Sequence, residues 1–164
     1  MIHLAFDPGT SGALAVLTPA PDWRCEIRDL PIAVREGKRR QTRHIDAVQL
    51  EAVLRAALPS GYRVTATVED VFTIPGKGSN VHSTDSLVES RSTVEAVCRL
   101  LGYDVQRVRP QTWQRFYGLK GGDKKASIAC AQRLYPQADI TLVKHHNRAE
   151  ALLIAHWARR QASA

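Results

Sequence analysis

Two short apolar runs near the amino end, separated by one glycine-rich turn, constrain the fold more than any other feature of the sequence. Residues 2–6 are apolar apart from one histidine, residues 7–12 read DPGTSG, and residues 13–17 are apolar again. Proline and glycine are typical of positions where a chain reverses, so this pattern predicts two antiparallel strands joined by a tight turn. The chain therefore opens with a hairpin, and Asp7 comes directly after the apolar residues of its first strand.

The rest of the chain alternates between strand and helix patterns. Alternation at 23–30 predicts a third antiparallel strand, and the β-branched run at 64–68 predicts a buried strand ending in the acidic pair Glu69 and Asp70. A fifth strand is expected at 103–108. Helical spacing of apolar residues and stop signals predict helices at 46–58, 87–101, 124–134 and 147–162, with a helical turn at 109–113. We expect an α/β fold with a five-stranded mixed sheet, antiparallel in its first three strands and flanked by helices, in one domain over residues 1–164.

Three segments are predicted to be loops. Residues 31–44 combine five Lys and Arg with a glycine and predict a solvated, mobile loop. Residues 75–86 are rich in Gly, Ser and Asn, and residues 118–123 form a glycine-rich basic loop.

Charge favours a polyanionic partner. The chain has 23 Lys and Arg against 16 Asp and Glu, a formal charge of +7 and an isoelectric point near 9.7. Nucleic acid is the first candidate for such a protein, although many small basic proteins bind none. No apolar run approaches the length of a membrane span or a signal peptide, so we expect a cytoplasmic protein of a bacterium or a phage-infected cell with no membrane partner.

Three carboxylates occupy unusual positions. Asp7 and Glu69 each follow a predicted strand, and Glu150 lies within the apolar helix sequence at 149–155. Acids that enter a core need a partner or a metal ion. Each has a simpler alternative: Asp7 could cap its turn, Glu69 could be a solvated strand-end acid, and Glu150 could pair with Arg148 or Arg159.

Oxygen ligands without thiolates suit magnesium or manganese better than structural zinc. Two such ions can activate water and stabilise the leaving oxygen in phosphodiester hydrolysis. His146, one helical turn before Glu150, would project from the same helix face, and His145 and Asn147 are nearby substitutes.

Several segments in order along the chain resemble the RuvC-type Holliday junction resolvases of the ribonuclease H-like fold. Residues 7–12 (DPGTSG) resemble the first family motif, residues 68–72 (VEDVF) the second, and residues 148–155 (RAEALLIA) the terminal one. The segments RPQTW at 109–113 and GDKK at 122–125 are similar to the family's connecting segments. Phage-encoded members are the closest in character.

The resemblance implies a homodimer that cuts four-way DNA junctions with two Mg²⁺ ions per active site and leaves ends that can be ligated in recombination and repair. It implies that Asp7, Glu69 and Glu150 hold the metals, with Asp7 bridging both ions. Family members usually have an aspartate shortly before the final acid, whereas this chain has histidines and Asn147; His146 is the expected fourth ligand. Because a neutral imidazole prefers softer ions, Mn²⁺ is a possible substitute that could support relatively more activity than in typical members.

The resemblance also implies DNA contacts. Phe72 matches an aromatic residue that stacks at the junction centre, with a core phenylalanine as the alternative. Lys125, and in second place Lys124, matches a basic position near the scissile phosphate, with a solvated lysine as the alternative. Arg39 and Arg40, in the basic run 35–43, have no clear family counterpart and could follow phosphates. The helix at 83–101 is the expected dimer element, although its apolar stripe could equally belong to the core.

The expected function is that of a metal-dependent, structure-selective DNA endonuclease. The alternatives are a nuclease of flaps or other branched phage replication intermediates and a catalytically silent junction-binding protein. The DPGTSG turn also resembles the phosphate loop of actin-like sugar and acetate kinases, but 164 residues are few for the two lobes that those enzymes need.

Overall fold

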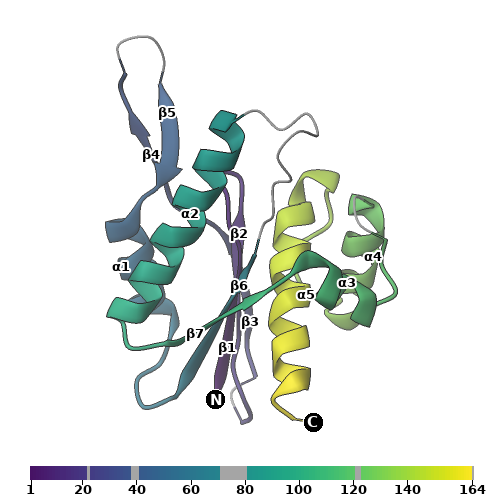
Figure 1. Cartoon of the computed structure of the whole chain (residues 1–164). Coiled ribbons are helices and arrows are strands. Elements are labelled where there is room, and N and C mark those ends of the chain that lie inside the picture. Colours follow the sequence, from purple (N-terminus) through teal and green to yellow (C-terminus); the bar gives the residue numbers. More distant parts are fainter. Residues whose placement is uncertain (22, 38–40, 71–80, 121–122, 164) are drawn as a thin grey trace.

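The computed structural model describes residues 1–21, 23–37, 41–70, 81–120 and 123–163, and, within this set, the helix over residues 81–84 by its backbone alone. A twisted sheet lies at the centre, with helices on both of its faces (Figure 1). None of the described helices is long and apolar enough to cross a lipid bilayer.

The central sheet has five strands in the order β3-β2-β1-β6-β7. Strands β1 (Ile2–Asp7), β2 (Ala13–Leu17) and β3 (Cys25–Asp29) form an antiparallel meander. Strands β6 (Val64–Glu69) and β7 (Asp104–Val108) extend the sheet in parallel from β1. The predicted five-stranded mixed sheet with three antiparallel strands at its start is confirmed.

The two faces of β1 and β2 belong to different cores. Large side chains such as Leu4, Phe6 and Leu14 face one core, which α1 (Ala47–Ala57) and α2 (Val81–Leu100) cover. Small side chains such as Ala5 and Ala15 face the other core. Because alanines take little room, the helix on that face can approach the strands closely.

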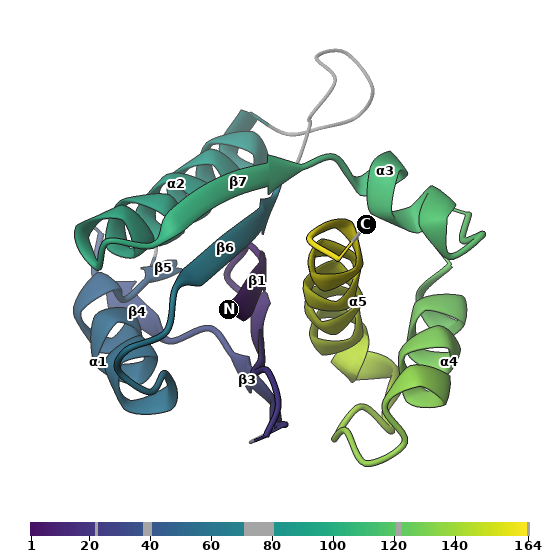
Figure 2. The same cartoon turned by 90° about the horizontal axis from the view of Figure 1, so that it is seen from below.

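That helix is α5 (His146–Gln161), which is buried over most of its length against β1 and β2. Helices α3 (Pro110–Phe116) and α4 (Lys124–Leu134) lie on the same side of the sheet, with α5 between α4 and the strands (Figure 2). The short helix η1 (Val143–His145) leads directly into α5. Asp123 caps the amino end of α4, because its side chain accepts a hydrogen bond from the backbone amide of Ala126 at 3.0 Å.

The prediction of a loop over residues 31–44 is wrong. Strands β4 (Ile32–Arg35) and β5 (Thr42–Ile45) form a separate antiparallel pair. Ile45 is buried and its register partner Ile32 packs against the same core cluster, so the end of the pair where β4 begins and β5 ends is anchored in the core. The basic composition indicated solvent exposure correctly, because Arg35 and Arg43 are exposed, but exposed arginines do not prevent a backbone hydrogen-bond ladder from forming.

The predicted loop at 75–86 is wrong over residues 81–86, which belong to α2, while residues 75–80 lie outside the described part of the chain. In the predicted loop at 118–123, residues 121 and 122 also lie outside it.

Candidate active site

Asp7 and Glu69 meet because their strands are parallel neighbours. Phe6 of β1 pairs with Val68 of β6, and each acid is the next residue along its own strand. The carboxyl ends of adjacent parallel strands lie at the same edge of a sheet, so the two carboxylates are brought to one place. Glu150 approaches this edge from α5, which packs along β1.

The surroundings of the Asp7 carboxyl group disfavour its negatively charged form. Desolvation raises its pKa well above the usual value, and the charges of Glu69 and Glu150 raise it further, while Lys124 acts in the opposite direction. If Asp7 only capped its turn, the two other carboxylates near it, Glu69 and Glu150, would have no explanation. Asp7 is therefore the centre of an acidic cluster.

Glu69 is nearly inaccessible to solvent, with 7% of its surface exposed, so the alternative of a solvated strand-end acid is wrong. Burial raises its pKa to about 7, and the charge of Glu150 adds to the effect. Trp113, itself fully buried, opposes this shift by donating a hydrogen bond from Nε1 to Glu69 Oε1 at 2.7 Å. A buried indole N–H needs an acceptor, and here the acceptor is a site carboxylate.

Trp113 is a site residue that sequence analysis missed. The tryptophan, four residues into a helical turn, was visible, and its burial could be expected from its size. Nothing in the local sequence, however, indicates that its N–H would reach an acid 44 residues earlier.

Of the two acids at the end of β6, only Glu69 is available to the site. Asp70 forms an ion pair with Arg91 of α2, and both side chains are mostly buried. Asp70 also donates its backbone N–H to Val108 of β7 at 2.8 Å. The neighbouring carboxylates thus have different roles: Asp70 ties β6 to α2 and β7, and Glu69 faces the acidic cluster.

Glu150 has no arginine partner among the described residues. Arg148 instead donates two hydrogen bonds to Asp29 at 2.6 and 2.8 Å and one to Asp139 at 3.0 Å, and Arg159 lies over the ring of Trp23. The predicted alternative that Glu150 pairs with Arg148 or Arg159 is therefore wrong.

Burial raises the pKa of Glu150, while the charge of His146, a long 3.4 Å hydrogen bond from Ser127 and the charge of Lys124 lower it. Ser127 is a second residue near the cluster that sequence analysis did not identify. Its position follows from α4 packing against α5, which a local pattern does not reveal.

The three positions considered for a fourth ligand differ in their surroundings. His146 is the one whose charge acts on Glu150, which agrees with one-turn spacing on the same helix face, and its Nδ1 lies 3.3 Å from the carbonyl oxygen of Val143. Asn147 donates from its side chain to the carbonyl oxygen of Ser11, so its amide nitrogen is already engaged. His145 lines a separate cavity beside the glycine-rich turn. His146 remains the predicted fourth ligand.

The two lysines at the start of α4 are both exposed but differ in their relation to the acids. The charge of Lys124 acts on both Asp7 and Glu150, whereas Lys125 is not among the charges that act on them. The geometry thus favours Lys124 as the basic residue near the cluster. The predicted DNA-contacting residues Phe72, Arg39 and Arg40 lie outside the described part of the chain.

The donor chemistry of the cluster fits a hard divalent cation. Three carboxylates are desolvated together with limited compensation from Lys124, and a cation between them would remove the repulsion that raises their pKa values. Within the residues that the structure describes, no three His, Cys, Asp or Glu side chains are arranged as a finished ligand set. The residues therefore suit the ion in type and location, and binding would require their side chains to draw together.

Comparisons with known sequences and structures show which proteins this chain resembles. No family model matches the chain. The chain is 32% identical over 158 residues to the chloroplastic Holliday junction resolvase MOC1 of Chlamydomonas reinhardtii; the match covers 85% of this chain and 18% of that protein. The structure superposes on Thermus thermophilus RuvC in complex with a Holliday junction substrate with a TM-score of 0.62 at 13% identity, covering 100% of this chain and 98% of that one. The chain has the RuvC fold and is similar in sequence to a Holliday junction resolvase.

A second structure of RuvC from the same bacterium gives a TM-score of 0.59 at 15% identity over 100% of this chain. The predicted ribonuclease H-like fold is confirmed. The chain spans less than a fifth of the length of the algal resolvase, so that protein's activity and substrates reach this chain only as proposals. The relatives come from an alga and a bacterium, and the phage origin stays a prediction.

Proposed function

We propose that this RuvC-like chain is a metal-dependent endonuclease that resolves four-way DNA junctions by paired nicks. The observation that carries the proposal is the convergence of Asp7, Glu69 and Glu150 at one edge of the sheet, desolvated and without an arginine partner in the described structure. A protein with a formal charge of +7 that gathers buried acids in one place combines attraction for a polyanion with a site for cations.

Asp7, Glu69, Glu150 and His146 would hold the metal, and Asp7 would be the central ligand, because the charges of both Glu69 and Glu150 act on it. Bound Mg²⁺ or Mn²⁺ would supply Lewis-acid charge that promotes attack of water on the phosphodiester and stabilises the leaving oxygen. Trp113 orients the Glu69 carboxylate and keeps its pKa from rising further. Lys124 supplies positive charge near the acids, where a phosphate in its transition state gains charge.

Paired nicks require two active sites, and the described part of one chain supplies the single acidic cluster of Asp7, Glu69 and Glu150. A homodimer would supply both sites, and α2 is the proposed dimer element. Val94, Val97 and Cys98 of α2 belong to the core, but Leu100 is 87% and Val88 44% exposed on the same helix. Light scattering on the purified chain tests the dimer: a mass near 36 kDa, twice the 18.2 kDa of one chain, is expected.

The deciding experiment incubates the protein with an end-labelled synthetic four-way junction in magnesium, in manganese and in EDTA, beside Asp7→Asn. Asp104→Asn is the matched control, since it makes the same chemical change at an exposed position at the start of β7, the opposite end of the sheet. We expect symmetric nicks that require metal, disappear in Asp7→Asn and persist in Asp104→Asn.

Three outcomes would contradict parts of the proposal. Wild-type protein that shifts the junction but cuts under neither metal would support a catalytically silent junction-binding protein. Faster cleavage of a flap or a Y-fork than of the four-way junction would support a general branched-DNA nuclease. Absence of both binding and cleavage would refute the proposed function as a whole.

A further inference from the structure

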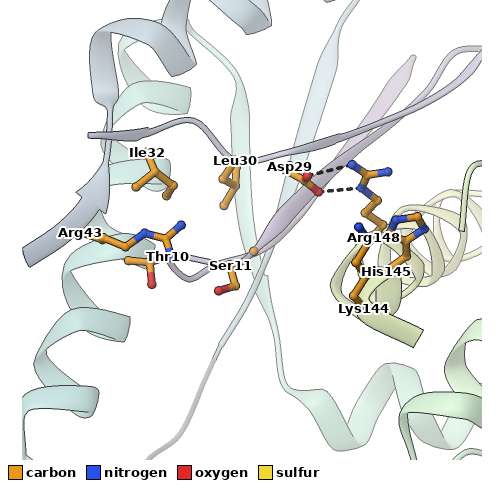
Figure 3. A pocket seen from close by; sticks show the side chains of 10 residues that line it. Thr10, Ser11, Asp29, Leu30, Ile32, Arg43, Lys144, His145 and Arg148 are labelled. Atoms are coloured by element: carbon orange, nitrogen blue, oxygen red, sulfur yellow. Dashed lines mark hydrogen bonds and ion pairs between the residues drawn. The ribbon is translucent and has the colours of Figure 1, made fainter. Parts of the chain in front are cut away.

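A polar cavity of about 270 Å³ lies at the glycine-rich turn that follows Asp7 and is not used by the proposed chemistry. The glycine-rich turn after β1 lies in the middle of its wall, as Figure 3 shows. Arg43 of β5 approaches from one side, and Lys144 and Arg148, at the start of η1 and α5, lie on the other (Figure 3). Together with residues 29–32, these segments, far apart in sequence, form one hollow.

The cavity has unbalanced positive charge. Arg148 is neutralised within the wall, because it makes two hydrogen bonds to the Asp29 carboxylate. Neither Arg43 nor Lys144 forms a salt bridge with a residue that the structure describes. The charge of Lys144 only contributes to lowering the pKa of Asp29, after the larger effect of Arg148. Two cationic side chains thus line the cavity without a carboxylate partner among the described residues.

The wall between these cations is fixed and offers hydroxyl groups. Thr10 and Ser11 line the cavity, and Asn147 holds the carbonyl oxygen of Ser11 against the start of α5. Gly12 closes the turn, and a Cβ at this position would lie 2.1 Å from the carbonyl oxygen of Asp7. Thr10, Ser11 and Gly12 follow Asp7 by three to five residues. The closed turn therefore fixes this part of the cavity wall relative to Asp7.

We infer that this cavity is a backbone-phosphate subsite, in which Arg43 and Lys144 hold a phosphodiester of the nucleic-acid strand next to the one bound at the acidic cluster. A guanidinium offers paired donors to phosphate oxygens, an ammonium adds a point charge, and the hydroxyls of Thr10 and Ser11 complete the set of donors. The inference rests on the proposed function, since it takes nucleic acid as the ligand. It also assigns a purpose to the β4–β5 pair, which brings Arg43 to the site.

The test measures binding of the protein to a labelled four-way junction in EDTA, where no cleavage competes, over a series of salt concentrations. The variants are Arg43→Gln, Lys144→Gln and their combination. Arg63→Gln is the matched control, because Arg63 is exposed and lies just before β6, at the opposite end of the sheet. All three substituted side chains are exposed, and thermal unfolding of each of the four variants verifies that the fold is retained.

Each lost phosphate contact should reduce the slope of log K against log salt by about 0.9, which corresponds to a roughly five-fold weaker affinity near 0.15 M salt. The double variant should therefore bind about 30-fold more weakly with a slope lower by about 2, while Arg63→Gln binds like wild type. Unchanged affinity and slope in the double variant would overturn the inference, as would an equal loss in Arg63→Gln.

A cleavage assay of the wild-type protein in magnesium tests the proposed nuclease function separately from the proposed phosphate subsite. Wild type that binds but does not cut, together with a weaker double variant, supports the subsite and refutes the nuclease. Wild type that cuts, together with a double variant of unchanged affinity, refutes the subsite alone. Wild type that does not bind the junction overturns both.

Discussion

The elevated pKa of Glu69 predicts that Glu69→Gln stabilises the metal-free protein, and that the gain grows with pH. In the folded protein, burial and the charge of Glu150 hold this pKa at about 7, above the usual value of 4.5. Between these values the folded state binds more protons than the unfolded state, so stability falls as pH rises through this range. Glutamine removes the titration and can still accept the hydrogen bond from Trp113.

The magnitude follows from the pKa difference of roughly 2.5, at about 1.4 kcal/mol for each pH unit. Relative to a side chain that does not titrate, Glu69 should cost the fold about 1 kcal/mol near pH 5 and about 3 kcal/mol near pH 8. The assay is urea unfolding of wild type and Glu69→Gln in EDTA at both pH values. The difference in unfolding free energy between the two proteins should increase by about 2 kcal/mol from the lower to the higher pH.

Glu95 supplies a control of opposite sign. It is also buried, with 2% of its surface exposed, but Arg107 and Arg99 bind its carboxylate and lower its pKa. Its ionised form therefore stabilises the fold at neutral pH, and Glu95→Gln should destabilise the protein at pH 8. The two substitutions are chemically identical, so only the surroundings of each carboxylate can produce opposite results.

Magnesium adds a second readout. If the acidic cluster holds the ion, millimolar Mg²⁺ should raise the stability of wild type near pH 8, and the effect should be much smaller in Glu69→Gln. A wild-type stability that declines between pH 5 and pH 8 no more than that of Glu69→Gln would refute the reasoning about desolvated carboxylates.

Three further predictions concern neighbouring residues. Trp113→Phe removes the donor that lowers the pKa of Glu69, so the rise of cleavage rate with pH should move to higher pH in a single-turnover profile, and an unmoved profile would show that the hydrogen bond is only structural. Lys124→Gln should slow single-turnover cleavage by about ten-fold or more and Lys125→Gln much less, whereas the reverse order would favour the residue first expected from the family resemblance. His146→Asp should lower the ratio of manganese-supported to magnesium-supported cleavage rates, because a carboxylate prefers the harder ion; an unchanged ratio would place the fourth ligand elsewhere.

Much of the fold follows from local patterns in the sequence. Short apolar runs, β-branched segments and glycine-rich turns define the strands, and helical spacing defines α1, α4 and α5 within a few residues. That Asp7 and Glu69 each follow a strand also comes from the sequence, whereas the parallel pairing of β1 with β6, which brings the two acids to one edge of the sheet, comes from the structure. Local composition failed at β4–β5, where the burial of Ile32 and Ile45 outweighs the basic residues between them.

The identity of each polar partner was decided only by tertiary structure. Sequence did not show that Asp70 would be neutralised by Arg91 while its neighbour Glu69 stayed in the site. Nor did it show that Arg148 would bind Asp29, 119 residues away, instead of Glu150 two residues away. Local periodicity indicates which residues form a helix or a strand, because side-chain direction repeats about every 3.6 residues in a helix and every two residues in a strand. Partners, desolvation and pKa shifts depend on which surfaces pack together, and packing joins residues whose separation along the chain carries no local signal.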